Sequence, residues 1–498
     1  MTHIWYRSTR GGEAMVSSAR AILRGIAADG GLFVPARFPE PVASLEALSG
    51  MDYRALACRL MTGFLTDFTE AEVRECVEGA YDAKFDAPEI APVVKRAGVH
   101  FLELYHGPTL AFKDMALTVL PHLLKIAGRK LGMERKIVIL TATSGDTGKA
   151  ALEGFAGVEG TEIIVFFPRH GVSEVQKRQM ITQAGDNTHV IGIEGNFDDA
   201  QTGVKAVFGD TEFLRRAEAA GAVFSSANSI NVGRLIPQIV YYFHAYLSLL
   251  RAGEVRSGSP IHVVVPTGNF GNILAAYYAE RLGLPVGRLL CASNRNRVLY
   301  EFLRTGVYDR NREFVPTISP SMDILISSNL ERLLFALSGE DPAAVRALMA
   351  ALAKDGRYAI TPEMRAGLGR FYGGWASEEE TRSAIKEVWE SAGYLMDTHT
   401  AVGYAVYRQY AAETGDPTPA VVAGTASPFK FARDVMAALD PRYAGRGDFE
   451  LLQEMAALTG GDVPAPIRDL ETRPIRHRRV CRKDEVKAAV AEVLGVCA

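Results

Sequence analysis

Three apolar runs, each followed by a helix-forming segment, constrain the fold more than any other feature of the chain. The runs are KIVILTA (136–142), EIIVFFP (162–168) and HVIGIEG (189–195). Each is apolar at consecutive positions, which predicts strands that are buried on both faces. The segments KAALEGFAG, SEVQKRQMITQAG and NFDDAQTGVKAVFGD follow them and have helical character. Buried strands that alternate with helices indicate βαβ units and a parallel sheet.

The rest of the chain predicts a second α/β unit. IHVVVP (261–266) is another buried strand, which a glycine-asparagine loop and the helix ILAAYYAERLG follow, and PAVVAGTASP (419–428) predicts a strand and a turn. Residues 1–95 predict mainly helices and turns, and residues 330–395 predict a helical insertion. We expect an N-terminal segment at 1–95, a small α/β domain at 135–234, and a large α/β domain made of 96–134 and 235–498.

Composition excludes several classes of protein. The chain has 498 residues and a formal net charge of −3, so no strong basic field predicts a nucleic-acid or membrane partner. Its five cysteines are scattered and form no CxxC pair, which predicts neither a disulfide framework nor a metal site and fits a reducing compartment. The apolar run 235–250 is shorter than the ~20 residues that span a bilayer. We expect it to be a buried helix, the basic run 473–483 to be a solvated surface segment, and the protein to be cytoplasmic.

Two loops that follow strands can bind an anion. In PTGNFGN (266–272), Gly268 and Gly271 let the backbone approach a ligand, and the next helix offers free N–H groups. The alternative is an ordinary turn. TATSGDTGK (141–149) lacks the first glycine of a P-loop and has Ala150 after the lysine, so the nucleotide-binding motif is excluded. Its hydroxyls and Gly145 can bind a carboxylate. A helix cap is the alternative.

A third polar stretch, SSANSINVGRLIPQ (225–238), comes before an apolar helix. A cap explains much of it. Arg234, near the expected helix start, can pair with an acid or bind a phosphate.

Lys113 stands in the stretch HGPTLAFKDMA (106–116), between a phenylalanine and an aspartate. A helix start and apolar neighbours both disfavour a charged amine, and both lower the pKa of a lysine, as a nucleophile requires. Taken alone, a lysine at a helix start is more typical of a surface residue whose charge reaches solvent. Together with a phosphate cup and a carboxylate loop, it predicts a pyridoxal-phosphate enzyme. Thr425, in GTASP (424–428), can face the pyridine nitrogen.

The motifs STRGG (8–12), DGGLFVP (29–35), HGPTLAFKD, TSGDTG, GNFGN, SPSMDILISSNLERLLF (319–335) and GTASP resemble those of the threonine synthases. These are fold-type II pyridoxal-phosphate enzymes similar in core to the tryptophan synthase β chain, and the resemblance covers essentially the whole chain. It implies that Lys113 forms the Schiff base with the cofactor and that Thr425 faces its ring nitrogen. The implied phosphate cup consists of Gly268, Asn269, Phe270, Gly271 and Asn272.

The same resemblance implies a substrate site. TSGDTG implies that Thr143, Ser144, Gly145 and Thr147 bind the substrate carboxylate. Asp146 stands where many fold-type II relatives have an asparagine that contacts the ring hydroxyl, and we assign it that contact. Ser229, Asn231 and Arg234 are the candidates for the substrate phosphate, from motif position and charge.

The implied reaction converts O-phospho-L-homoserine and water to L-threonine and phosphate. The alternatives are another fold-type II enzyme, such as a threonine dehydratase or a cysteine-forming synthase, and a non-catalytic threonine synthase-like protein. We expect a small-molecule substrate and a monomer or homodimer.

Overall fold

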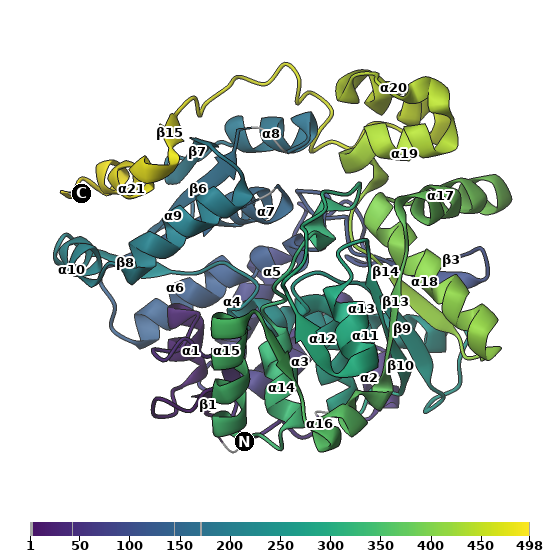
Figure 1. Ribbon diagram of the computed structural model, residues 1–498, viewed down its shortest axis with the longest axis horizontal. Coiled ribbons are helices and arrows are strands. Elements are labelled where there is room, and N and C mark those ends of the chain that lie inside the picture. The colour runs from purple at the N-terminus through teal and green to yellow at the C-terminus, as the bar shows by residue number, and fades with distance from the viewer. Residues whose placement is uncertain (1–2, 42, 144, 170–171, 498) are drawn as a thin grey trace.

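The computed structural model describes residues 3–41, 43–143, 145–169 and 172–497 (Figure 1). Within these residues the two largest sheets have six and five strands, in the orders β13-β10-β9-β14-β4-β3 and β15-β7-β6-β5-β8. The strands of the larger sheet are β3 (Val93–Arg96), β4 (Val99–Glu103), β9 (Ile261–Pro266), β10 (Val286–Ser293), β13 (Phe371–Trp375) and β14 (Ala420–Gly424). Those of the smaller sheet are β5 (Lys136–Ala142), β6 (Thr161–Pro168), β7 (Thr188–Glu194), β8 (Ala222–Ser225) and β15 (Val480–Arg482).

Both sheets are buried on two faces, as their continuous apolar runs predict. In β9, Val263 and Val265 belong to one hydrophobic cluster, whereas Val264 between them belongs to another on the opposite face. In β5, Ile139 packs in the same cluster as Val263, and Val138 packs on the far side of the smaller sheet. Alternate side chains of a strand point to opposite faces, so helices must cover both. The predicted α/β fold with two doubly wound sheets is confirmed.

Helices fill the connections between strands (Figure 1). The helices of the first half are α1 (Ser18–Arg24), α2 (Leu45–Ser49), α3 (Tyr53–Phe64), α4 (Glu70–Ala80), α5 (Asp114–Leu117), α6 (Leu120–Lys130), α7 (Asp146–Phe155), α8 (Glu174–Ile181), α9 (Phe197–Gly209), α10 (Thr211–Ala219) and α11 (Val232–Arg251). Those of the second half are α12 (Gly271–Arg281), α13 (Val298–Thr305), α14 (Leu330–Leu337), α15 (Pro342–Asp355), α16 (Pro362–Ala366), α17 (Glu378–Ala392), α18 (Thr398–Thr414), α19 (Ala432–Leu439), α20 (Asp448–Thr459) and α21 (Val486–Leu494).

Two of the predicted boundaries are wrong in part. The stretch 330–395 is not purely helical, because β13 lies within it and pairs in parallel with β10 at the edge of the larger sheet. The C-terminal end of the chain does not stay with the larger sheet either. After α20 the chain crosses to the smaller sheet, where β15 pairs with β7 (Figure 1). Residues 480–482 therefore belong to the smaller sheet, although the expected large domain of 235–498 included them.

The N-terminal segment is mainly helical, as expected, but it also contains a short two-stranded sheet that the sequence did not reveal. Its strands are β1 (Tyr6–Ser8) and β2 (Phe33–Pro35), which pair antiparallel. Two further short strands, β11 (Val307–Asp309) and β12 (Arg357–Ala359), pair in the same way. Tyr6 and Phe33 are fully buried, so this segment packs into the main body of the protein.

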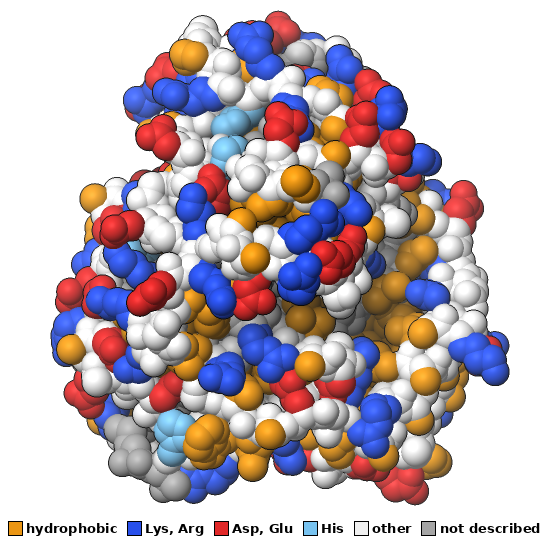
Figure 2. Space-filling model, turned by 90° about the vertical axis from the view of Figure 1, so that its left-hand side faces the viewer, with side chains coloured by type: hydrophobic (Ala, Val, Ile, Leu, Met, Phe, Trp, Pro, Cys, Tyr) orange, Lys and Arg blue, Asp and Glu red, His pale blue; other side chains and the backbone are white. Residues whose placement is uncertain are grey.

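The apolar run 235–250 lies within α11, nearly all of whose side chains are buried. The predicted buried helix is therefore confirmed. Among the described residues, no helix combines the length and the hydropathy that crossing a membrane requires. Figure 2 shows acidic and basic side chains interspersed over the face drawn, which agrees with the small net charge.

Candidate active site

The candidate loops all leave a sheet at the carboxyl end of a parallel strand. In the larger sheet, the lysine loop follows β4, the glycine-asparagine loop follows β9, and Thr425 follows β14. In the smaller sheet, the loop that leads to Asp146 follows β5, and the loop that leads to Arg234 follows β8. Ligands of open α/β sheets bind at this edge. The topology thus places all the predicted loops where a shared site can form.

Asp114 sets the shape of the lysine loop. Its carboxylate accepts hydrogen bonds from the backbone N–H of Thr109 at 2.8 Å and from the Thr109 hydroxyl at 2.5 Å. Burial raises the pKa of Asp114 to about 6, against the effect of these hydrogen bonds. A Cβ on Gly107 would come within 2.6 Å of the Asp114 side chain, so the turn requires glycine there.

The lysine loop pairs with the GTASP turn. The backbone N–H of Phe112 donates to the carbonyl of Thr425 at 2.8 Å, and Ala111 forms an antiparallel bridge with Ala426. The residue before Lys113 is therefore hydrogen-bonded to Thr425, which brings the lysine loop and the GTASP turn together.

Lys113 is buried and stands at the start of α5. Burial lowers the pKa of its amine to about 8, and the positive charges of Lys430 and Arg234 lower it further, whereas Asp146 raises it. Its Nζ lies 3.7 Å from Oδ2 of Asp146. The sequence-based expectation of a lowered pKa agrees with this geometry, although burial and two nearby cations produce the shift.

Asp146 begins α7 and joins both domains at the site. Its Oδ1 lies 2.6 Å from Nζ of Lys430 and accepts a hydrogen bond from Nε2 of Gln176 at 3.0 Å. The hydroxyl of Ser321 lies 3.4 Å from Oδ2. Burial alone would raise the pKa of this carboxyl, but Lys430 and Lys113 outweigh burial and hold the pKa far below its usual range. Asp146 is therefore an ionised carboxylate between two lysines.

Sequence reasoning missed Lys430, Gln176 and Ser321. Lys430 is almost completely buried, and its Nζ also donates to the carbonyl of Thr109 at 2.8 Å. One signal was present in the sequence: two residues after GTASP, Lys430 follows a phenylalanine, as Lys113 does in AFKD. Gln176 and Ser321 carry no comparable signal, because only tertiary contacts bring them to Asp146.

The carbonyl groups of the glycine-asparagine loop are tied to a single neighbouring segment. The hydroxyl of Ser327 donates to the carbonyl of Gly268 at 2.8 Å. The backbone N–H and the Nδ2 group of Asn329 donate to the carbonyl of Asn269 at 3.1 Å and 3.0 Å. In a trans peptide the carbonyl and the following N–H point in opposite directions, so the N–H groups of Asn269 and Phe270 point away from that segment. With the N–H groups at the start of α12, they make a cup that can bind an anion.

Close packing also shapes the cup. A Cβ on Gly268 would come within 2.7 Å of the backbone carbonyl oxygen of Ser321, whereas a Cβ on Gly271 would meet nothing closer than 3.4 Å. Phe270 is buried and has a left-handed backbone, with φ of 63°. Asn272 accepts hydrogen bonds from Tyr241 at 2.7 Å and from Tyr242, and its buried Nδ2 donor has no partner among the described residues.

Hydrogen bonds within the TSGDTG loop use up some of its polar groups. The hydroxyl of Thr143 accepts hydrogen bonds from the N–H groups of Gly145 at 3.0 Å and Gly148 at 2.9 Å, and donates to the carbonyl of Gly145. One donor and two acceptor positions are all that a threonine hydroxyl has, so Thr143 shapes the loop and is withdrawn as a substrate ligand. Ser144 lies outside the described residues. Gly145 is buried and Thr147 is half-buried in the first turn of α7, where free N–H groups remain available.

In the third loop, which leads to Arg234, internal hydrogen bonds likewise use up the donors of one candidate residue. Asn231 is fully buried, caps α11 through its Oδ1, and uses both Nδ2 hydrogens on the carbonyls of Ile22 and Ser226. A phosphate needs a donor and Asn231 has none left, so it is withdrawn as a phosphate ligand. Ser229 is half-buried and lies next to the cup, because its Cβ is 3.9 Å from where a Cβ on Gly271 would stand.

Arg234 is a buried cation without a carboxylate partner among the described residues. Its guanidinium donates to the carbonyl of Ala227 at 2.9 Å, and its Nε has no hydrogen-bond partner in the part of the chain that the structure describes. Burial lowers the pKa of Arg234 to about 10, which leaves it charged at neutral pH. Its positive charge lowers the pKa of Lys113, so the guanidinium is within electrostatic range of that amine. A buried guanidinium with a free donor beside the lysine can bind an anion.

The fold and this set of groups, an amine of lowered pKa, an anion cup and a second cation, define a pyridoxal-phosphate-dependent enzyme. Family models match three stretches of the chain: "Threonine synthase N terminus" at residues 5–81, "Pyridoxal-phosphate dependent enzyme" at 85–369 and "Threonine synthase, C-terminal" at 400–490. The chain therefore belongs to the threonine synthase family, and its cofactor is pyridoxal phosphate.

Relatives support this assignment. The chain is 42% identical to the threonine synthase of Pseudomonas aeruginosa over 437 residues, which are 86% of this chain and 89% of that protein. It is 40% identical to threonine synthase-like 1 of Macaca fascicularis over 450 residues, or 88% of this chain, but it spans only 60% of that relative's length. The solved structure of pyridoxal-phosphate-bound threonine synthase from Brucella melitensis is 38% identical, with a TM-score of 0.87 and coverage of 99% of this chain and 98% of that one.

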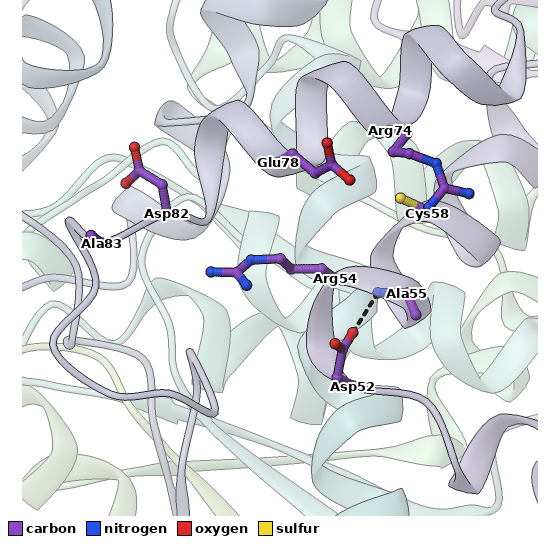
Figure 3. Close-up of a pocket in the computed structure, with 8 residues that line it drawn as sticks. All are labelled: Asp52, Arg54, Ala55, Cys58, Arg74, Glu78, Asp82 and Ala83. Carbon is purple, nitrogen blue, oxygen red and sulfur yellow. Dashed lines mark hydrogen bonds between the residues drawn. The ribbon is translucent and has the colours of Figure 1, made fainter.

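A hollow of about 560 Å³ lies elsewhere, between α3 and α4 (Figure 3). Arg54 and Arg74 line it together with Asp52, Glu78 and Asp82. The anion loops and Lys113 are absent from its lining, so it does not belong to the candidate active site.

Proposed function

We propose that this protein is a threonine synthase that converts O-phospho-L-homoserine and water to L-threonine and phosphate. The observation that carries the proposal is the juxtaposition of Lys113, whose pKa is lowered to about 8, with a buried Arg234 that has no carboxylate partner among the described residues. An amine near neutrality suits proton transfer, and a second cation suits a substrate phosphate. A substrate that carries both an amino-acid carbon skeleton and a phosphate uses both groups.

Several groups of this chain would contact the cofactor. The N–H groups at 269–272 would hold the cofactor phosphate, Lys113 would hold its aldehyde carbon, and Thr425 would face its ring nitrogen. Asp146, which stays ionised, would accept the hydrogen bond of the ring hydroxyl. The buried Nδ2 of Asn272, which has no partner, fits a polar ligand at this end of the cup. When bound, pyridoxal phosphate withdraws electrons from the Cα atom of the substrate.

Lys113 would act on protons once the substrate amine has displaced it. Its Nζ would take a proton from Cα and one from Cβ, which allows phosphate to leave from Cγ. Returning one proton to Cγ and one to Cα, while the hydroxyl of water adds at Cβ and its remaining proton goes to the phosphate, gives L-threonine. A pKa of about 8 lets one amine both accept and return protons near neutral pH. Thr425 is a neutral hydroxyl and cannot hold a ring nitrogen protonated as a carboxylate can, which suits a sequence of elimination and addition steps.

The substrate groups have separate places. Thr147 and the N–H groups of Asp146 and Thr147 at the start of α7 would bind the carboxylate, because they have no partner among the described residues. Arg234 and Ser229 would bind the substrate phosphate beside the cofactor cup. Thr143 and Asn231 support these contacts by holding their loops in shape.

Supplying phosphohomoserine and following both phosphate and threonine tests the proposal. Equal amounts of the two products are expected, together with loss of both in Lys113→Ala and retention in the surface control Lys125→Ala. 2-Ketobutyrate as the main product would instead favour a dehydratase. Bound cofactor without turnover would favour a non-catalytic threonine synthase-like protein.

A further inference from the structure

Arg332, in the first turn of α14, is the largest side chain of the described residues that is almost completely buried. Its Nε donates to the carbonyl of Phe33 at 3.0 Å, and one terminal nitrogen donates to the carbonyl of Ile230 at 2.6 Å. The other terminal nitrogen donates to Oδ1 of Asn329. Its partners belong to three segments: the N-terminal segment, the loop before α11, and the segment that supports the cofactor cup.

The contact with Asn329 determines how the cup is held. A guanidinium only donates hydrogen bonds, so it faces the oxygen of the Asn329 amide and leaves the NH₂ group on the opposite side. That NH₂ group donates to the carbonyl of Asn269 at 3.0 Å. Arg332 thus fixes the direction of the Asn329 amide, and the amide fixes the peptide whose N–H would donate to the cofactor phosphate.

The contact with Ile230 determines the position of the other anion loop. Ile230 lies between Ser229 and Asn231, and Arg234 follows in the first turn of the next helix. Ser229 is already adjacent to Gly271 of the cup. One guanidinium therefore contacts the loop of the second cation directly and the cofactor cup through one residue.

We propose that Arg332 is a positioning residue that fixes the spacing between the cofactor-phosphate cup and the loop that carries Ser229 and Arg234. This inference rests on the proposed function, which assigns the second loop to the substrate phosphate. The guanidinium donates from three separate nitrogens in a rigid plane, whereas the three donors of a lysine ammonium share one nitrogen and cannot occupy the same three positions. Burial lowers the pKa of Arg332 to about 10, so the guanidinium is charged at neutral pH.

The same role gives a function to the N-terminal motifs STRGG and DGGLFVP, because they contact Arg332 and its neighbour Glu331. Glu331, next to Arg332, accepts hydrogen bonds from the Thr9 hydroxyl at 2.6 Å and from Arg10 at 2.9 Å and 2.8 Å. The STRGG motif therefore holds the first turn of α14 in place, and the Phe33 carbonyl of the DGGLFVP motif holds Arg332 itself. Both motifs support Arg332 from behind the site.

Arg332→Lys and Asn329→Asp distinguish the two contacts of Arg332. Arg332→Lys affects both the cofactor cup and the loop of Ser229 and Arg234, whereas Asn329→Asp affects only the cup. In Arg332→Lys we expect the dissociation constant for pyridoxal phosphate and the KM for phosphohomoserine each to rise at least about tenfold. In Asn329→Asp an oxygen replaces the NH₂ group and faces the Asn269 carbonyl. We therefore expect cofactor affinity to fall by a similar factor while the KM at saturating cofactor changes much less. Cofactor binding is measured by titrating cofactor-free protein and following absorbance, without substrate.

Glu331→Gln is the matched control, because it weakens the contact with the N-terminal segment but leaves Arg332 and Asn329 intact. Glu331→Gln should lower the thermal midpoint and change the dissociation constant and the KM much less than Arg332→Lys does, because the three hydrogen bonds of Arg332 remain. If Arg332→Lys lowers only the thermal midpoint, Arg332 is merely structural and the inference is overturned. A change in cofactor affinity with an unchanged KM would also overturn it, since the two sites would then be independent. Absence of turnover in the wild-type protein would overturn the proposed function. The effect of Arg332→Lys on cofactor affinity would still test whether Arg332 positions the cup.

Discussion

Nζ of Lys430 lies 2.6 Å from Oδ1 of Asp146, and both side chains are buried. The second carboxylate oxygen faces the amine of Lys113 at 3.7 Å. Two buried ammonium groups around one carboxylate leave a positive charge when both are protonated, and the Arg234 guanidinium nearby adds a second. An excess of buried positive charge destabilises a protein unless an anion or a proton loss compensates it. A cofactor phosphate, a substrate phosphate and a neutral Lys113 each reduce that excess.

Lys430→Met should raise the pKa of Lys113 above about 8, because the charge of Lys430 lowers it. Only a neutral amine captures the cofactor aldehyde. The rate at which cofactor-free protein captures pyridoxal phosphate should therefore reach half its maximum at a higher pH in the variant. Stopped-flow absorbance at a series of pH values measures this. Lys149→Met, at a buried lysine paired with Glu153, should leave the midpoint in place; an unshifted midpoint in Lys430→Met would contradict the coupling.

Lys113→Met should stabilise the cofactor-free protein at pH 7. The pKa of Lys113 falls from 10.5 to about 8 on folding, so the folded state binds fewer protons than the unfolded state between these values. The resulting destabilisation is fully present below pH 8 and fades as the pH rises towards 10.5. We expect a gain of roughly 1–3 kcal/mol in the free energy of unfolding at pH 7 that shrinks above pH 8. Urea unfolding at pH 7 and 9.5 measures it, and a gain that did not change with pH would point to packing instead of charge.

How much of the fold the sequence predicts depends on how a strand is buried. β5 and β9 have the predicted bounds, 136–142 and 261–266, because both faces of each are covered and most of their positions are apolar. β13 was missed because FYGGW contains two glycines and lies at a sheet edge. β15 was missed because VCR has three residues and joins the smaller sheet after a long crossing that local sequence does not encode.

The candidate site divides along a similar line. Loops such as GNFGN were predictable because glycines in the sequence mark positions where a neighbouring atom or a ligand packs directly against the backbone. The sequence could not separate ligands from residues that hold a loop or cap a helix, because threonine and asparagine do both. Only the count of their hydrogen bonds assigns Thr143 to shaping its loop and Asn231 to capping α11. Lys430 reaches Asp146 across 284 positions of the chain, so no local pattern could place them together.

Gly268→Ala should weaken both stability and cofactor binding. Its Cβ would stand 2.7 Å from the carbonyl oxygen of Ser321, a backbone atom that cannot move without shifting the cup. Overpacking of this kind costs about 1–3 kcal/mol. Gly271→Ala is the steric control for stability, since its nearest neighbour would be 3.4 Å away. Thermal midpoints of the cofactor-free variants should fall for Gly268→Ala and stay close to wild type for Gly271→Ala, and equal midpoints would remove the steric argument for Gly268.

Arg234→Ala should raise the KM for phosphohomoserine by roughly 10–100-fold and change cofactor affinity far less, because a hydrogen bond to a charged group contributes about 1.5–3 kcal/mol. The guanidinium is buried, charged and has a free Nε, and the cofactor cup is built from other residues. Arg251→Ala, at the opposite end of α11, removes the same type of side chain far along the helix and should leave the KM unchanged. Steady-state kinetics at saturating cofactor, with cofactor affinity titrated separately, distinguishes the two effects. An unchanged KM in Arg234→Ala would remove this residue from the phosphate site, and a parallel loss of cofactor affinity would assign it to the cofactor instead.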